Sequence, residues 1–257
     1  MTALLEARGI RKSFAGVMAL HFVDIDVDAG ETVGLIGPNG AGKTTFFNCV
    51  LGILRSDSGV VRFDGRDISG LRVHERARCG IGRTFQRIEL FAESTVREHL
   101  LIAERTRHGT GRLWKDLLGM GRPHNDEIAR CDEVLELLGL GAVAEAPIEH
   151  LSLGQGRLVE VGRALMTDPK LLLLDEPSSG LDRKETADLA ATLRKVQSEK
   201  GFAILLVEHD VEFVAGFTER SYVLDFGTMI AQGPTREVLR DPIVREAYLG
   251  VPATEGT

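Results

Sequence analysis

The sequence predicts an α/β fold with a mainly parallel central sheet, an antiparallel part near the N-terminus and an inserted helical part. Three continuous apolar runs, "TVGLIG", "KLLLLDE" and "FAILLVEH", are each followed by a helical pattern, as expected for parallel strands that are buried on both faces. An alternating apolar and polar run lies near the N-terminus. Between about residues 93 and 144 the strand signals give way to helical spacing.

Length, charge and cysteine content limit the class of protein. With 257 residues, of which 43% are hydrophobic, the chain can form one large α/β domain or two small ones around an ample core. The net charge of -7 argues against a surface built to neutralise nucleic-acid phosphates, so we expect no nucleic acid partner. The three cysteines lack paired spacing, which suggests neither a zinc site nor a disulfide framework and fits a reducing cytoplasm.

The sequence contains no recognisable export signal or membrane span. The N-terminal stretch "MTALLEARGIRKSF" is charged where a secretory signal needs its apolar segment. The longest apolar runs are far shorter than the roughly 20 residues that a spanning helix requires. We therefore expect a chain that does not itself cross a membrane.

The first third of the chain predicts an antiparallel sheet. Val23, Ile25 and Val27 alternate with aspartates, the period of a strand with one face exposed to water. In "VVRFDGRDI" the pair Asp64-Gly65 follows an apolar strand, and this pair favours a two-residue hairpin turn.

The middle of the chain predicts a helical subdomain. In "DEIARCDEVLELLGL" the apolar residues Ile128, Val134, Leu135 and Leu138 recur at helical spacing. The preceding stretch "RHGTGRLWKDLLGMGRPHN" is rich in glycine and arginine, so it is either a mobile loop or a short helix around Trp114 that is flanked by turns.

A glycine-rich loop between a predicted strand and a predicted helix is the first candidate site. Residues 37–44, "GPNGAGKT", fit the phosphate-loop pattern in the correct context. Gly40 and Gly42 let successive backbone N–H groups and the helix N-terminus point at phosphate oxygens, and Lys43 adds a charge near the terminal phosphates. The Thr44 hydroxyl is suited to bind magnesium.

Polar residues at the ends of apolar runs extend the site. In "LLLLDEP", Asp175 is placed to hold magnesium and Glu176 to polarise a water that attacks the terminal phosphate. Gln86 in "IGRTFQ" and His209 in "AILLVEHD" end two further runs, and each could reach the terminal phosphate or its water. A lone histidine in this position is more often structural, so only the neighbouring motifs favour a catalytic role.

A second candidate anion site lies in "LSLGQGRLVEVGRAL", residues 151–165. Ser152 and Gly154 stand immediately before an amphipathic run and predict a helix N-terminus. An ordinary helix cap is the alternative interpretation.

The order of these motifs resembles the nucleotide-binding subunits of ATP-binding cassette (ABC) transporters over essentially the whole chain. Phosphate loop, Gln86, "LSLGQ", "LLLLDEP", "SSGLD" and His209 follow one another as in that family. The resemblance implies the P-loop NTPase fold of ABC ATPases, with a RecA-like core, an N-terminal antiparallel β-subdomain and an inserted α-helical subdomain. It implies one nucleotide-binding domain over residues 1–257, with the core and β-subdomain in 1–90 and 160–250 and the helical subdomain in 91–159.

The same resemblance assigns roles to individual residues, with ATP and Mg²⁺ as cofactors. Phe14 in "IRKSFAG" looks like the aromatic that stacks on adenine, although a core phenylalanine at a strand end is the alternative. The implied nucleotide-binding residues are Phe14, Gly37, Pro38, Asn39, Gly40, Ala41, Gly42, Lys43, Thr44, Thr45, Ser152, Gly154, Gln155 and Asp182. The implied catalytic residues are Glu176, His209, Gln86 and Lys43, and the implied metal ligands are Thr44, Gln86 and Asp175.

ABC ATPases work in pairs, so the resemblance also implies partners. Two subunits dock head to tail, and Ser152 and Gly154 of one close over the ATP held by the phosphate loop of the other. The second subunit is either a like chain or a related ATPase. The resemblance places Asp182 at the interface between the two subunits, near the opposite active site. The chain departs from the most common signature by having Leu153 where glycine is frequent, which puts only fine details in doubt.

Subfamily features point to an importer. "IGRTFQRIELFAESTVREHL", the glycine-rich insert, "GLDRKET", "ILLVEHDVEFV" and the terminal "VREAYLG" resemble the ATP-binding subunits of branched-chain amino acid importers. This resemblance implies transmembrane permease subunits, an extracytoplasmic solute-binding protein and a location on the inner face of the cell membrane. The alternatives are the ATPase of a lipopolysaccharide-export system, which shares the "YLG" ending, and an ABC ATPase of DNA repair, which the acidic charge and the lack of sustained heptads disfavour.

Overall fold

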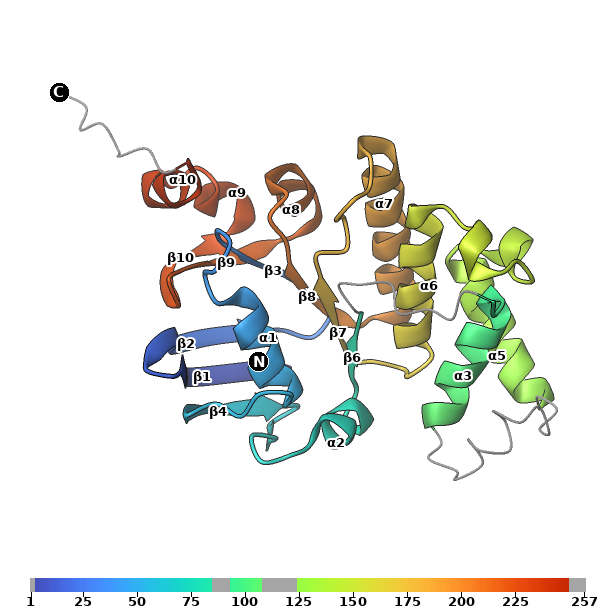
Figure 1. Cartoon of the computed structure of the whole chain (residues 1–257), viewed down its shortest axis with the longest axis horizontal. Helices are drawn as coiled ribbons and strands as arrows, with labels where there is room; N and C mark the ends of the chain where they lie inside the picture. The colour runs from blue at the N-terminus through green and yellow to red at the C-terminus, as the bar shows by residue number, and fades with distance from the viewer. Residues whose placement is uncertain (1–2, 85–92, 108–123, 250–257) are drawn as a thin grey trace.

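The computed structural model describes residues 3–84, 93–107 and 124–249, and two sheets organise them (Figure 1). The larger sheet has the order β10-β9-β3-β8-β7-β6. Its strands are β10 (Thr228–Pro234), β9 (Arg220–Asp225), β3 (Thr32–Ile36), β8 (Ala203–Val207), β7 (Leu171–Asp175) and β6 (Ile81–Arg83). The smaller sheet has the order β2-β1-β4-β5, with β2 (Val17–Val27), β1 (Leu5–Phe14), β4 (Ser58–Phe63) and β5 (Arg66–Asp67).

The three continuous apolar runs form β3, β7 and β8 at the centre of the larger sheet, as predicted. Every residue of these strands is buried, and β8 pairs in parallel with both neighbours. Val207 lies opposite Leu35 on one side and Asp175 on the other. Because parallel strands end at one edge, the segments that follow β3, β7 and β8 meet there.

The N-terminal antiparallel sheet is also confirmed. Val23, Ile25 and Val27 of β2 are fully buried, and β1 pairs antiparallel with β2 and β4. Asp64 and Gly65 have φ angles of 51° and 74°, the left-handed values that a two-residue hairpin turn requires. They join β4 to β5, which pair antiparallel.

Helices cover both faces of the larger sheet (Figure 1). In chain order they are α1 (Lys43–Leu51), α2 (Val73–Arg78), α3 (Val96–Arg107), α5 (Asn125–Leu137), the short 3₁₀ helices η1 (Gly141–Val143) and η2 (Ile148–His150), α6 (Leu153–Leu165), α7 (Arg183–Lys200), α8 (Val211–Phe217), α9 (Thr235–Val238) and α10 (Pro242–Leu249).

Alternation along the central strands divides the core into two parts. Leu172 and Leu174 of β7 belong to a cluster with residues of α3, α5, α6, α7 and α8. Leu171 and Leu173 belong to a second cluster with α1 and the antiparallel sheet. Since neighbouring strand residues point to opposite faces, α1 packs on one face of the larger sheet and α6 on the other.

The predicted helix in the middle of the chain is confirmed as α5. Val134, Leu135 and Leu138 are buried and Ile128 is partly buried, so the apolar side of α5 faces α3 and α6. The stretch around Trp114 lies outside the described residues.

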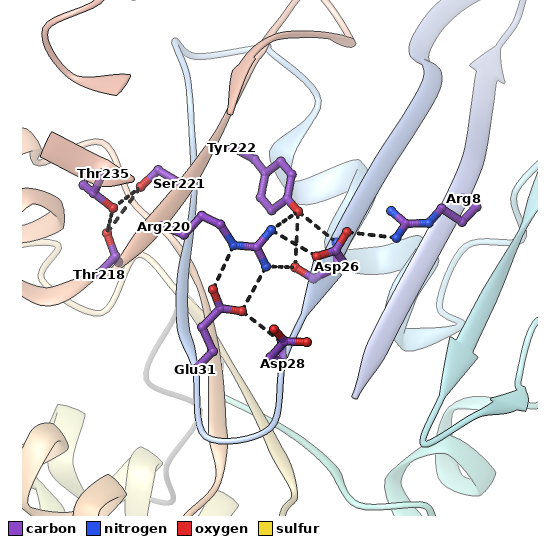
Figure 2. A network of polar contacts seen from close by, with 9 residues as sticks. All are labelled: Arg8, Asp26, Asp28, Glu31, Thr218, Arg220, Ser221, Tyr222 and Thr235. Atoms are coloured by element: carbon purple, nitrogen blue, oxygen red, sulfur yellow. Dashed lines mark hydrogen bonds and ion pairs between the residues drawn. The ribbon is translucent and has the colours of Figure 1, made fainter. Parts of the chain in front are cut away.

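An ion-pair network joins the two sheets (Figure 2). The Arg220 guanidinium of β9 donates to the Asp26 carboxylate of β2 at 3.0 Å and to both oxygens of Glu31 at 2.8 and 2.9 Å. It also donates to the Tyr222 hydroxyl at 2.6 Å. Arg8 of β1 donates to the second oxygen of Asp26 at 2.9 Å. The network thus fixes the antiparallel sheet against the larger one.

In the part of the chain that the structure describes, no helix combines the length and the apolar character needed to cross a bilayer.

Candidate functional site

The loop between β3 and α1 owes its shape to glycines with left-handed φ angles. Gly37, Gly40 and Gly42 have φ values of 147°, 81° and 102°. A Cβ atom on Gly37 would lie 2.0 Å from the Leu224 carbonyl oxygen, and a Cβ on Gly42 would lie 2.6 Å from a backbone oxygen of β2. Both positions therefore require glycine because of φ and because of space. The loop then leads directly into the first turn of α1.

Lys43 is the first residue of α1 and folds back over the loop. Its Nζ donates to the carbonyl oxygens of Gly37 at 2.6 Å and Pro38 at 2.9 Å. Burial lowers the pKa of Lys43, whereas the carboxylates of Glu176, Asp175 and Glu208 act in the opposite direction. The ammonium group is therefore held inside the loop, facing the acidic edge of the sheet.

The other predicted loop residues differ in their exposure to solvent. Asn39, Gly40 and Thr44 are exposed, whereas Pro38 and Thr45 are partly buried. Ala41 is buried, and its carbonyl oxygen accepts from the Gly227 N–H at 3.0 Å. The turn between β9 and β10 thus holds the loop through this hydrogen bond.

Asp175 ends β7 as a buried carboxylate. Its Oδ2 accepts from Arg83 at 3.2 Å, and its Oδ1 is buried without a hydrogen-bond partner among the described residues. Burial raises the pKa of Asp175, and the Arg83 guanidinium opposes this shift. A buried carboxylate oxygen without a partner is costly unless a cation or a donor satisfies it.

Glu176 follows with a different backbone. Its φ of 49° is uncommon for a residue with a side chain, and its N–H donates to the Val207 carbonyl oxygen at 2.8 Å. The Glu176 Oε1 lies 4.0 Å from Nδ1 of His209, whose side chain is 55% exposed. The structure therefore brings together two of the predicted catalytic residues.

Glu208 is a functional candidate that sequence reasoning missed. It is fully buried at the end of β8. One of its oxygens accepts from the N–H and the hydroxyl of Ser178, and the other accepts from the His209 N–H at 3.0 Å. Glu208 thus links the segment after Glu176 to the segment of His209. The only sequence signal was a second carboxylate beside His209 in "VEHD".

The predicted signature residues form a second cluster. The Ser152 hydroxyl accepts from the Gln155 N–H at 3.2 Å, and the Gln155 side chain accepts from the Ser152 N–H at 3.0 Å. This capping box begins α6 at Leu153. Asp182 caps α7 in the same manner, since its Oδ1 accepts from the Glu185 N–H at 2.8 Å. The helix N-terminus predicted at Ser152 is thus confirmed, whereas Gly154 lies inside the first turn of α6 rather than before it.

Contacts between the start of α6 and the segment before α7 hold this second cluster together. A Cβ on Gly154 would lie 3.5 Å from the Glu185 side chain of α7, and one on Gly180 would lie 3.0 Å from Leu153. Arg157 donates to the Ser179 carbonyl oxygen at 3.2 Å. The start of α6 therefore lies beside the "SSGLD" segment. In Figure 1 the phosphate-loop helix α1 lies across β6 and β7 from α6, in agreement with the two core clusters.

Two predicted residues stand apart from these contacts. Phe14 ends β1 and is 45% exposed, with Nζ of Lys12 5.5 Å from its ring centroid. A buried core phenylalanine is therefore wrong for this position. Gln86 lies outside the described residues; β6, which precedes it, pairs in parallel with β7.

A phosphate-binding loop between a buried strand and a helix, with acidic residues at the same sheet edge, defines a P-loop ATPase. The sequence pattern of the family described as "ABC transporter" matches residues 20–179. That of the family described as "Branched-chain amino acid ATP-binding cassette transporter" matches residues 228–254. The chain belongs to the ABC transporter family and is an ATP-hydrolysing subunit of this type.

Curated relatives match over nearly their full length. The high-affinity branched-chain amino acid transport ATP-binding protein BraF of Pseudomonas aeruginosa is 38% identical, covering 96% of this chain and 98% of the relative. The probable branched-chain amino acid transport ATP-binding protein LivG of Archaeoglobus fulgidus is 39% identical, covering 98% of this chain and 97% of the relative. The lipopolysaccharide export system ATP-binding protein LptB of Acidithiobacillus ferridurans is 34% identical, covering 97% and 98%.

Solved structures agree with this family. An ATP-binding cassette of an ABC transporter in its ADP conformation has a TM-score of 0.87 and 34% identity, covering 98% of this chain and 100% of the other. A nucleotide-free cassette has a TM-score of 0.86 and 33% identity, covering 97% and 100%. The ABC ATPase fold expected from the sequence is thereby confirmed.

Proposed function

We propose that this ATPase powers the import of branched-chain amino acids or related small polar solutes. The observation that carries the proposal is the match of residues 228–254 to the branched-chain amino acid family, which adds to the full-length similarity to BraF and LivG. Residues 228–249 of this match contain β10, α9 and α10, and α10 lies beside the phosphate loop.

The binding of ATP divides among three groups of residues. The exposed ring of Phe14 presents a face on which adenine can stack. The loop residues Gly37, Pro38, Asn39, Gly40, Ala41, Gly42, Lys43, Thr44 and Thr45 surround the phosphates with backbone N–H groups and the helix N-terminus. Ser152, Gly154, Gln155 and Asp182 contribute from the second subunit.

Magnesium fits the donors that the chain offers. The orphaned, buried Oδ1 of Asp175 and the exposed hydroxyl of Thr44 are the oxygen ligands that Mg²⁺ prefers, and Gln86 is the third proposed ligand. The described residues contain no group of three acidic, histidine or cysteine side chains that could hold a metal. When bound, Mg²⁺ neutralises charge on the phosphates.

Hydrolysis then depends on the acidic edge of the larger sheet. Glu176 accepts the proton of the attacking water, and its position is set by the bond from its N–H to Val207. His209, 4.0 Å from Glu176, orients that carboxylate and the terminal phosphate. Lys43 meets the negative charge that develops on the transferred phosphoryl group.

The signature cluster requires a second ATPase subunit. Since α6 packs on the face of the sheet opposite α1, Ser152 and Gly154 do not extend the phosphate loop of their own chain. A head-to-tail pair, of like chains or of this chain with a related ATPase, brings them onto the partner's nucleotide. ATP binding closes this pair and hydrolysis reopens it.

An apolar groove is the proposed docking surface for a permease subunit. It has a volume of about 340 Å³ between α2, β6, α3 and α6. Ile53, Val73 and Ile102 line it with exposed apolar side chains, which a monomer has no reason to leave open to water. An apolar segment of a permease at the inner face of the membrane fits this groove, and an extracytoplasmic protein delivers the solute to that permease.

The test is purification of the tagged chain from its own cells in mild detergent, followed by identification of the co-purifying proteins. We expect two permeases, a sibling ATPase and a binding protein, whose ligand is then measured by calorimetry with leucine, isoleucine and valine. Recovery of lipopolysaccharide-export components, or of no membrane protein, would contradict the proposal.

The groove is tested in the same experiment with two matched variants. Val73→Glu places a charge at the first residue of α2, where Val73 is 44% exposed. Val211→Glu does the same at the first residue of α8, where Val211 is 43% exposed and outside the groove. We expect Val73→Glu to lose the permeases and Val211→Glu to retain them. Equal recovery with both variants would remove the groove from the proposal.

A further inference from the structure

The helix α10 carries residues 244–249, "VREAYL", of the "VREAYLG" motif, to which the proposed reaction gives no role. Asp241 caps the helix, since its Oδ1 accepts from the Ile243 N–H at 2.9 Å. Val244 is buried in the same core cluster as α6 and α8, and Tyr248 packs against that cluster. The helix is thus fixed to the body of the protein at both ends.

Tyr248 reaches from this helix to the phosphate loop. Its hydroxyl oxygen accepts a hydrogen bond from the Gly37 N–H at 2.7 Å, across 211 residues of sequence. Gly37 is the first residue after β3, and its carbonyl oxygen accepts from Nζ of Lys43 at 2.6 Å. Gly37 therefore links two side chains: its N–H donates to the Tyr248 hydroxyl, and its carbonyl oxygen accepts from the Lys43 ammonium group.

The phenol suits this task because it stays neutral. Burial raises the pKa of Tyr248 to about 12, and the nearby Glu208 carboxylate adds to the shift. At physiological pH the hydroxyl keeps its proton and adds no negative charge beside a phosphate site.

Among the described residues, the outer side of the loop borders a cavity. Between the loop and α10 lies a cavity of about 480 Å³, which Pro38, Asn39, Gly40 and Ala41 line from one side and Ile243 and Glu246 from the other. The crest of the loop thus borders this cavity, so the position of the loop depends on the bond from Gly227 to Ala41 and on how its start is fixed. The bond to Tyr248 is made at that start.

We infer that Tyr248 is a positioning residue for ATP: it fixes the Gly37 peptide, and through it the phosphate loop and Lys43. The C-terminal helix is then part of the nucleotide site although it contacts no phosphate. This inference rests on the proposed role of Lys43 in binding the nucleotide.

The test uses the two tyrosines of the chain. Tyr248→Phe removes only the hydroxyl that accepts from Gly37. Tyr222→Phe is the matched control, because the Tyr222 hydroxyl also accepts a backbone N–H, that of Asp26 at 3.2 Å, but lies in the network between the sheets. Calorimetry measures the dissociation constants of MgATP and MgADP, and amide hydrogen exchange measures the protection of Gly37.

For Tyr248→Phe we expect about fivefold weaker nucleotide binding, as for loss of one buried hydrogen bond, and faster exchange at Gly37. For Tyr222→Phe we expect wild-type affinity and wild-type exchange at Gly37, even where its melting temperature falls. Wild-type affinity and exchange in Tyr248→Phe would overturn the inference. Lys43→Ala is measured in parallel: if it too binds like wild type, the proposed role of the loop lysine fails, which is a separate result.

Discussion

At the residue scale, the two adjacent carboxylates of Asp175 and Glu176 differ in backbone conformation and surroundings. Asp175 still belongs to β7 and is buried beside Arg83. Glu176 has already left the strand with a φ of 49°, which turns its side chain toward His209. A strained conformation of this kind persists only where the surroundings enforce it, here through the bond from the Glu176 N–H to Val207.

This difference predicts the effect of Glu176→Gln. The amide keeps the size of the side chain but cannot accept the proton of the attacking water, so turnover should fall by roughly 10²-fold or more. ATP should still bind, because the loop residues are unchanged. Steady-state phosphate release and nucleotide affinity are measured together.

Glu199→Gln serves as the control for this change, since it removes an exposed carboxylate near the end of α7. It should leave turnover unchanged. If Glu176→Gln hydrolysed ATP at a near-normal rate, Glu176 would lose its assignment as the base.

At the element scale, local signals predicted the strands and caps well. Continuous apolar runs identified β3, β7 and β8, because burial on both faces leaves no polar positions. Asp64-Gly65 identified a hairpin, and Ser152 preceded the first residue of α6. In each case the residues that determine the structure are neighbours in sequence, so the pattern is visible without the fold.

Contacts between distant segments could not be predicted in this way. Arg220 meets Asp26 across 194 residues and Tyr248 meets Gly37 across 211. Nothing near Arg220 or Tyr248 in sequence indicates a partner, since each pairing exists only after two elements pack. Glu208 was missed for a related reason: a glutamate at a strand end usually faces water, but here it is buried and accepts hydrogen bonds from Ser178, 30 residues away in sequence.

The network around Arg220 predicts a stability change for the contact between the two sheets. Arg220→Met keeps much of the side-chain volume but leaves Asp26 and Glu31 without their shared partner. We expect the free energy of unfolding to fall by about 2 kcal/mol, the typical contribution of hydrogen bonds to charged groups. Chemical denaturation measures it. Lys170→Met, which removes an exposed ion pair with Asp64, should cost less than about 0.5 kcal/mol.

This stability difference should depend on pH in one direction. Burial by itself raises the pKa of Asp26, but hydrogen bonds from Arg8 and Arg220 outweigh it and lower the pKa below 3.8. A lowered pKa stabilises the folded state above the unfolded pKa and loses this contribution as pH falls. The difference in free energy of unfolding between wild type and Arg220→Met should therefore have its full value above about pH 5 and decrease below about pH 4. A gap that grows on acidification would contradict the network.

At the scale of the whole molecule, the larger sheet separates the two halves of the proposed ATP site. The core cluster on one face contains residues of α1, and the cluster on the other contains residues of α6. The capping boxes at Ser152 and Asp182 and the bond from Arg157 to Ser179 form the signature cluster from contacts within one chain. Such a preformed surface suits docking onto a second subunit without reordering.

Head-to-tail pairing predicts that two inactive variants restore each other. Lys43→Ala disables the phosphate loop and Ser152→Arg disables the signature, so each variant alone should be inactive as a homodimer. In a mixed dimer, the intact loop of the Ser152→Arg chain faces the intact signature of the Lys43→Ala chain. Random mixing makes half of the dimers mixed with one intact site of two, so about a quarter of wild-type turnover should return. If both motifs acted within one chain, every site in the mixture would carry a defect and no turnover would return.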